Sequence, residues 1–256
     1  MISEALLIEE IFPEVAWKRK ESKIVNTDDW YQIITPEAPT IALNGIYRSI
    51  LDEKTFEESI LAVIGEYKYL NLPFRWIIGP SSKPSTLESK LIEYGFQLNS
   101  EISGMVATSN EIRAHIAPNI SVETVDVTTL DDYLEASSSG WSIAGKLKTE
   151  LRKDLFTSIQ SQDQTLIYCL ARYKGTPAGA AALKLTSRSA HLIGGSVHPD
   201  FRKRGVYQSL VAYRTNLAVK LGKSLITTHA IKTTSAPLCE KMGLREVASF
   251  KMLYLP

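Results

Sequence analysis

The sequence predicts a mixed α/β fold, with tandem halves that each place a mostly antiparallel central sheet among flanking helices. Strand patterns and helix patterns alternate along both halves. The second part of the first half follows the same order of elements as the end of the second half. The 256 residues have 44% hydrophobic content, which suffices for one large core or two modest ones. These three observations predict two domains of ordinary size.

The second half begins with three apolar runs that read as antiparallel strands, because short turns separate them. They cover approximately residues 165–173, 178–185 and 190–197. A helix follows, because apolar residues recur at a 3.6-residue period from Val206 until Gly222 ends the pattern. The expected order is completed by a strand at 224–228, a short helix at 235–242 and a last strand at 247–255.

The run 197–207 joins the third strand to the long helix and offers a place to hold a phosphate. A helix that starts near Val206 has unpaired N–H groups and a partial positive charge at its first turn. Gly205 lets the backbone approach a ligand, and three cationic residues precede it: Arg202, Lys203 and Arg204. The same residues also suit an ordinary turn with a solvated basic rim.

From about Ser121 to Pro256, the chain resembles the GNAT superfamily of acyl-CoA-dependent N-acyltransferases. The family's signature is Gln or Arg, two residues, Gly, one residue, then Gly or Ala. Arg202 and Gly205 meet it between the expected strand and helix, whereas Tyr207 replaces the small residue and either crowds the site or stacks along it. The resemblance implies acetyl-CoA as co-substrate, with its pyrophosphate on backbone amides. The expected contacts are Ser196, Val197, Arg202, Lys203, Arg204, Gly205, Val206, Tyr207 and Gln208.

The resemblance also indicates where a general acid belongs. Many family members carry a tyrosine four residues before a helix-ending glycine, where its hydroxyl can protonate the departing thiolate. Here Cys239 has that position before Gly243. A thiol with a pKa near 8.5 could serve as the acid, but a buried cysteine is more often a small core residue. Both interpretations of Cys239 stay open.

A general base is harder to assign, because the strand that enters the loop contains histidines but no glutamate. His198 has a suitable pKa for accepting a proton, although its place before Pro199 also suits a solvated turn. His229 is a further candidate, and a water chain can do this work in the family. By the resemblance, the backbone N–H near Val197 polarises the thioester carbonyl, and we favour that amide over any side-chain base. We expect no metal.

The first half repeats the later elements of the second half but lacks the phosphate loop. We expect a helix around 56–67, a strand at 74–78, a short helix at 84–94 and a strand at 102–108; aligning Gly95 with Gly243 gives an offset of 148 residues. Asp52 and Glu53 precede the helix, where carboxylates would satisfy its amides and repel a phosphate. We therefore expect a degenerate GNAT-like domain at 1–112, a linker at 113–120 and a CoA-binding catalytic domain at 121–256.

Acceptor specificity is expected in the stretch 129–160, which reads as two helices that family members use as a movable wall. Trp141 lies near their joint, where it could stack on a substrate or anchor the joint. Five acidic residues could attract an amine or form a solvated helix face: Asp131, Asp132, Glu135, Glu150 and Asp154.

Charge and cysteine content limit the partners and the compartment. Lys plus Arg number 29 against 28 for Asp plus Glu, and the net charge of +1 argues against nucleic acid or an anionic membrane. Cys169 and Cys239 do not suggest a disulfide framework, and charges interrupt the N-terminal apolar stretch. We expect a cytoplasmic protein without signal peptide or membrane span, and a homodimer stays open.

The function expected from these features is N-acetyl transfer to an amine of a small molecule or a peptide, by direct attack in a ternary complex. A catalytically silent CoA-binding protein is the first alternative, because Tyr207 and Cys239 both depart from the family pattern. A scaffold that binds no cofactor is the second.

Overall fold

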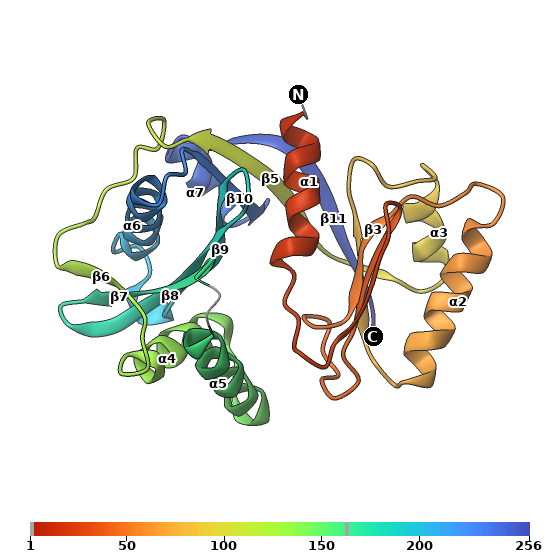
Figure 1. Ribbon diagram of the computed structural model, residues 1–256, viewed down its shortest axis with the longest axis horizontal. Helices are drawn as coiled ribbons and strands as arrows, with labels where there is room; N and C mark the ends of the chain where they lie inside the picture. Colours follow the sequence, from red (N-terminus) through yellow and green to blue (C-terminus); the bar gives the residue numbers. More distant parts are fainter. Residues whose placement is uncertain (1–2, 162–163) are drawn as a thin grey trace. The chain divides into compact units, whose positions relative to one another are not determined.

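The computed structural model describes residues 3–161 and 164–256 and confirms the mixed α/β fold (Figure 1). Its contacts divide the chain into two compact units, each with helices packed on a sheet. The first unit comprises Met1–Met105, Ala230–Pro237 and Glu246–Pro256, and the second comprises Val106–His229 and Leu238–Arg245. The part of the chain that the structure describes includes no helix long and apolar enough to cross a membrane.

The first unit has the strand order β1-β2-β3-β4-β11-β5. The pair β3 and β4 is parallel, whereas β1–β2, β2–β3 and β4–β11 are antiparallel. Its elements are α1 (Glu4–Val15), β1 (Lys23–Asn26), β2 (Trp30–Ile34), β3 (Gly45–Ser49), α2 (Phe56–Tyr69), β4 (Phe74–Ile78), α3 (Leu87–Glu93), β5 (Gln97–Thr108) and β11 (Arg245–Leu255).

The core of the first unit forms where α2 and α3 cover the sheet. The apolar face of α2 is buried, and Tyr67 stacks on Phe74 of β4 with ring centroids 4.1 Å apart. Trp76 is fully buried, and its indole N–H donates to Ser49 Oγ at 3.0 Å. The aromatic residues of β4 therefore fix this face of the sheet against α2.

The second unit has the strand order β10-β9-β8-β7-β6, and only the pair β9 and β10 is parallel. Helix α6 covers one face of this sheet, and α4 and α5 cover the other (Figure 1). Its elements are β6 (Ile120–Thr124), α4 (Leu130–Trp141), α5 (Gly145–Gln160), β7 (Leu166–Tyr173), β8 (Thr176–Leu185), β9 (Ala190–Val197), the 3₁₀ turn η1 (Pro199–Phe201), α6 (Val206–Lys220), β10 (Leu225–Ile231) and α7 (Ala236–Lys241).

The offset of 148 residues relates the later elements of the two halves. It carries α2 onto α6, α3 onto α7, and β5 onto β11 within two residues at their first positions. In both halves the strand before the long helix pairs in parallel with the strand after it. The tandem arrangement expected from the sequence is thus present in the order and pairing of the elements.

The last strand of the second half belongs to the first unit. Strand β11 pairs with β4 from Lys251↔Ile78 to Leu255↔Phe74, and the end of β5 falls in the second unit. The segments 1–112, 113–120 and 121–256 remain a prediction in sequence order, whereas the compact units exchange chain segments. Hydrophobic alternation shows that β11 is a strand but carries no information about which sheet it joins.

Candidate functional site

The loop between η1 and α6 has the backbone geometry of an anion cradle. Gly205 precedes the first residue of α6 with φ +84°, and a Cβ on it would lie 2.7 Å from Ala117 Cβ. Lys203 also has a positive φ, +62°. No described side chain caps the first turn of α6, and that turn contains no acidic residue. The uncapped N–H groups of this turn can therefore donate hydrogen bonds to a negatively charged group.

The cationic side chains around the cradle differ in their surroundings. Arg202, Lys203 and Arg204 are all exposed. The guanidinium of Arg204 lies over the ring of Tyr173, 5.1 Å from its centroid, and near Phe201. Stacking on these rings favours an orientation of Arg204 beside the loop.

The other expected contact residues on α6 point in different directions. Val206 is buried and packs against Gly179, where a Cβ would lie 2.6 Å from Val206 Cγ1. Gln208 is held at the surface by a hydrogen bond from its Nε2 to His115 Nδ1 at 2.8 Å. Val206 can therefore contribute only its backbone to the loop, whereas Gln208 also has its side chain at the surface.

Strands β9 and β10 separate beside this loop. Their parallel pairing runs from Ile226↔Ala190 to Thr228↔Leu192, yet β9 continues to Val197. The register of β9 against β8 shifts between Ala180 and Ala182, and Gly194 has φ +58° at that irregularity. A bulge bends the strand, and here it accompanies the separation of the two strands.

The separation leaves one backbone amide directed at the gap. His198 N–H donates to Ala178 O of β8 at 2.9 Å. Successive N–H groups of a strand point to opposite edges, so the Val197 N–H points away from β8, toward the side where β10 no longer pairs. The preceding residue is Ser196, whose Oγ is buried without a hydrogen-bond partner among the described residues.

Helix α4 closes over this strand end at Gly140. A Cβ on Gly140 would lie 2.7 Å from Ser196 Cβ and 3.2 Å from the Val197 nitrogen. Trp141 follows and is 50% exposed, and Ser142 then ends the helix with φ +56°. The glycine therefore permits a close approach of α4 to the amide that faces the gap.

The acidic residues of this region are engaged in ion pairs. Asp131 accepts from Arg152 Nε at 2.7 Å, and Glu135 accepts from Lys148 at 2.6 Å, which ties α4 to α5. Asp132 pairs with Arg172 of β7 at 2.7 Å. Each acidic side chain of α4 therefore has a basic side chain of the same unit as its partner. This arrangement favours a structural role over the attraction of an amine substrate.

Tyr207 points into the second unit rather than over the loop. A Cβ on Gly195 would lie 2.8 Å from Tyr207 Cε2, so the ring occupies the space that this glycine leaves. The Tyr207 hydroxyl lies 3.5 Å from Cys239 Sγ of α7, and Cys239 is 1% exposed. Burial raises the pKa of both groups, so both are protonated at neutral pH.

Two of the candidate histidines are placed quite differently. His198 Nδ1 accepts the Asp200 N–H at 3.2 Å and thereby caps η1. His229 Nδ1 lies 3.2 Å from His191 Nε2, and His191 Nδ1 lies 2.9 Å from Thr227 Oγ1. Burial lowers the pKa of His191 well below its ordinary value, and His229 and Arg214 act in the same direction. Neutral His191 therefore fixes the orientation of His229, which stands one residue beyond the last β9–β10 pair.

Sequence reasoning missed Arg214, which is 1% exposed at the centre of α6. Its Nη1 donates to Ala182 O at 2.9 Å and Ile193 O at 3.2 Å, and its Nε donates to Leu210 O. These carbonyls flank the bulge of β9, so the guanidinium satisfies acceptors at the irregular part of the ladder. An arginine four residues after Leu210, within the apolar stripe, was the available signal.

Across residues 3–161 and 164–256, no three His, Cys, Asp or Glu side chains are grouped to hold a metal ion. Cys169 and Cys239 are both free and buried.

Comparison with known proteins adds a family to this geometry. A model described as "Acetyltransferase (GNAT) family" matches residues 130–244. A search of curated proteins found no match.

Solved structures share the fold over nearly the whole chain. A GCN5-related N-acetyltransferase from Kribbella flavida is 12% identical with a TM-score of 0.74, covering 100% of this chain and 97% of that one. A functionally unknown conserved protein from Staphylococcus epidermidis ATCC 12228 is 14% identical with a TM-score of 0.72, covering 95% and 96%. A tandem GNAT protein from the clavulanic acid biosynthesis pathway is 9% identical with a TM-score of 0.63, covering 97% and 87%. At these identities the likeness shows the fold.

Proposed function

Because residues 130–244 are a domain of the GNAT acetyltransferase family, we propose that this protein transfers the acetyl group of acetyl-CoA to an amine of a small molecule or a peptide. The observation that carries the proposal is the uncapped first turn of α6 beside the gap between β9 and β10. The N–H groups from Lys203 to Gln208 would hold the pyrophosphate, with Gly205 allowing its close approach.

Two further observations fit coenzyme A at this place. Ser196 Oγ is a buried hydroxyl without a described partner, and the Val197 N–H faces the gap. Acetyl-CoA, when bound, supplies an activated acetyl group as a thioester. The Val197 N–H would donate a hydrogen bond to the carbonyl oxygen as negative charge develops there, and the strand holds this donor in position beforehand.

For the proton that leaves the attacking amine, the geometry favours His229 over His198. His198 has a structural task in capping η1. His229 stands where the strands separate, and the hydrogen bond with buried His191 fixes its ring. His191 would act as a positioning residue, because it holds the tautomer of His229 through the chain that continues to Thr227.

For the proton delivered to the departing thiolate, we propose the Tyr207 hydroxyl. Cys239 has the position of the family's tyrosine, and the Tyr207 hydroxyl lies 3.5 Å from its sulfur, reaching it from α6 instead of α7. Burial raises the pKa of this hydroxyl, so it holds a proton at neutral pH, although the same shift makes it a weaker acid than a free tyrosine.

The same contact favours one alternative function. Because Tyr207 spans from α6 to α7 beside the bulge of β9, its ring could fill space that the cofactor arm needs, which would make the protein catalytically silent. Two substitutions separate these readings. Tyr207→Phe removes only the hydroxyl, whereas Tyr207→Gly opens the space and restores the family's small residue.

The test measures acetyl-CoA affinity by calorimetry and free-thiol release with a panel of amino acids, polyamines, aminoglycosides and peptides. Binding together with amine-dependent thiol release supports acetyl transfer. Binding and turnover that appear only in Tyr207→Gly support the silent alternative, and absent binding in every variant contradicts both.

A further inference from the structure

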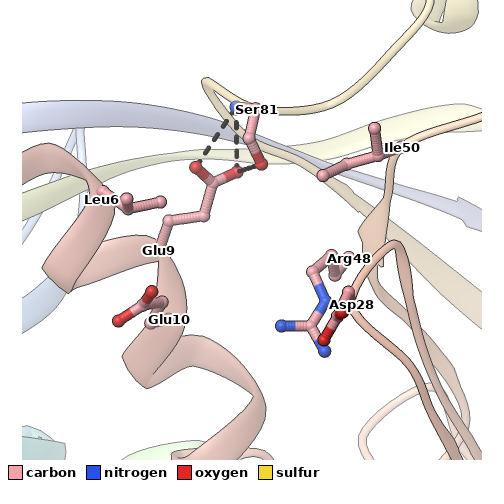
Figure 2. Close-up of a pocket in the computed structure, with 7 residues that line it drawn as sticks. All are labelled: Leu6, Glu9, Glu10, Asp28, Arg48, Ile50 and Ser81. Atoms are coloured by element: carbon pink, nitrogen blue, oxygen red, sulfur yellow. Dashed lines mark hydrogen bonds between the residues drawn. The ribbon is translucent and has the colours of Figure 1, made fainter.

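A small cavity lies in the first unit between α1, the turn that joins β1 to β2, the end of β3 and the loop after β4, with a volume of about 120 Å³ (Figure 2). A second hollow of about 300 Å³ shares Glu10 and Arg48 with it. The lining of the smaller cavity combines two apolar side chains, a serine and four charged residues: Leu6, Ile50, Ser81, Glu9, Glu10, Asp28 and Arg48. All of them belong to the first unit, so nothing in this cavity depends on the acetyl-transfer site.

Arg48 presents its charge to the cavity without an ionic partner among the described residues. Its Nη2 donates to Asn26 Oδ1 at 2.7 Å and to Thr27 O at 2.5 Å, and both acceptors are neutral. Its Nε is buried and finds no acceptor in the described part of the chain. A buried donor without a partner destabilises the fold, and a bound acceptor would offset that cost.

Glu9 presents the opposite charge from α1, and it too is held by a neutral partner. Its Oε1 accepts from Ser81 Oγ at 2.8 Å and from Ser81 N at 3.1 Å (Figure 2). A Cβ on Gly79 would collide with Glu9 Oε1, so the glycine makes room for this seat. Burial raises the pKa of Glu9, whereas the hydrogen bonds from Ser81 and the more distant charge of Arg48 act in the opposite direction.

Opposite charges that line one cavity normally pair with each other, since the pair lowers the cost of burial. Here neutral groups seat Glu9 and Arg48 separately, and no ion pair within 4.0 Å joins them. Figure 2 shows the guanidinium reaching from β3 toward α1, with Glu9 and Glu10 on the helix opposite. A molecule that bears both charges would give Glu9 and Arg48 an oppositely charged partner each.

We propose that this cavity binds a small zwitterion, an α-amino acid of the size of glycine or alanine, with its ammonium on Glu9 and its carboxylate on Arg48. The small volume of about 120 Å³ favours a ligand of few non-hydrogen atoms over a bulky one. Leu6 and Ile50 supply apolar walls beside the α-carbon. Glu10 and Asp28 add negative charge, so an anion without an ammonium group fits poorly.

The test titrates full-length protein, without acetyl-CoA, with glycine, alanine, leucine, acetate and methylamine, and follows the Ser81 backbone amide by NMR. Glycine and alanine should change the chemical shift of this amide, and the change should approach saturation at about 10 mM ligand, ten times a millimolar Kd. Acetate and methylamine each carry only one of the two charges. Each should therefore bind at least roughly tenfold more weakly than alanine. Leucine should be excluded by size.

Substitutions localise the effect. Glu9→Gln and Arg48→Gln should each weaken alanine binding roughly tenfold or more, whereas the controls Glu53→Gln and Lys54→Gln, on an exposed turn outside the cavity, should not change it. A flat titration of the wild type overturns the proposal, as does methylamine or leucine binding as well as alanine. Should Glu9→Gln or Arg48→Gln unfold the protein, the ligand series on the wild type decides alone.

Discussion

The Tyr207 hydroxyl lies 3.5 Å from Cys239 Sγ, so a residue at the start of α6 reaches the position that the family's tyrosine occupies on α7. Gly195 makes the contact possible, because a Cβ there would lie 2.8 Å from the Tyr207 ring. The two residues that depart from the family pattern, Tyr207 and Cys239, are therefore in contact and fill the same part of the second unit.

This relationship predicts opposite outcomes for the two side chains. Tyr207→Phe should lower turnover by about a hundredfold, the low end of what general acid catalysis contributes, and leave acetyl-CoA affinity unchanged. Cys239→Ala removes only a buried sulfur and should retain most turnover, at a cost of about 1 kcal/mol in the free energy of unfolding. Steady-state kinetics and calorimetry on both variants check this. A large loss in Cys239→Ala with full activity in Tyr207→Phe would assign the acid to the thiol.

Reversing charge at the loop should weaken acetyl-CoA binding. Arg204→Glu places a negative charge next to the uncapped turn of α6, where the pyrophosphate is proposed to lie, and we expect an affinity loss of tenfold or more. Lys220→Glu is the matched control, since it makes the same charge change on an exposed residue at the other end of α6. Calorimetry that finds equal affinity in both variants would remove the pyrophosphate from this loop.

The buried guanidinium of Arg214 should contribute strongly to stability. Arg214→Met keeps much of the volume but leaves Ala182 O and Ile193 O without their donor, which should lower the free energy of unfolding by about 2–4 kcal/mol. Arg214→Lys should recover only part of this, because one ammonium on a flexible stem lacks the planar fork. Urea unfolding followed by tryptophan fluorescence measures both. Wild-type stability in Arg214→Met would show that the carbonyls find other donors.

His191 should make the stability of the protein depend on pH. Its pKa is lowered in the folded state, so the unfolded chain binds the proton more readily. The stability is fully present above the unfolded pKa near 6.5 and falls as the pH drops below it, by at most about 1.4 kcal/mol per pH unit for one proton. Urea unfolding between neutral and mildly acidic pH should show this slope, and His191→Gln should reduce it. The exposed His115→Gln is the control, and an unchanged slope in His191→Gln would assign the effect elsewhere.

The sequence predicted strands wherever apolar alternation and turns coincide. The bounds of β9 and β4 agree with the prediction, and α6 begins at Val206 as expected. The strands β1, β2, β3 and β6 were not predicted, because their four or five residues are too few to give a clear period. Helix α1 was missed although its buried residues Leu7, Ile8, Ile11 and Phe12 recur with a helical period. In the turn before α2, Asp52 Oδ1 accepts a hydrogen bond from the Lys54 N–H. It does not cap the amides of the helix, contrary to the expectation from the sequence.

The site was predictable only as far as local sequence determines it. The loop and its glycine follow from a short motif in its context. The contact between Tyr207 and Cys239, the pair of His191 and His229, and the burial of Arg214 all join residues that are distant in sequence. Such contacts depend on which strands pair and where a bulge falls, and neither is encoded in the periodicity of one segment.

At Gly140, a methyl group added by substitution with alanine would have two opposing effects on stability. Gly140→Ala should favour helix α4 by about 1 kcal/mol, because alanine loses less backbone entropy than glycine. The added Cβ would lie 2.7 Å from Ser196 Cβ and 3.2 Å from the Val197 nitrogen, and overpacking of this kind costs about 1–3 kcal/mol. Since the neighbouring atoms are a Cβ and backbone, they cannot swing away, and the steric cost should exceed the gain.

The expected result for Gly140→Ala is a modest loss of stability with a larger loss of turnover, because the strained contact is at the amide proposed to polarise the thioester. Gly65→Ala is the matched control: Gly65 lies in α2, and no atom lies within 4 Å of its added Cβ. That variant should gain stability and keep its turnover. If Gly140→Ala behaves like Gly65→Ala in unfolding and kinetic assays, the approach of α4 to Val197 is unimportant for the reaction.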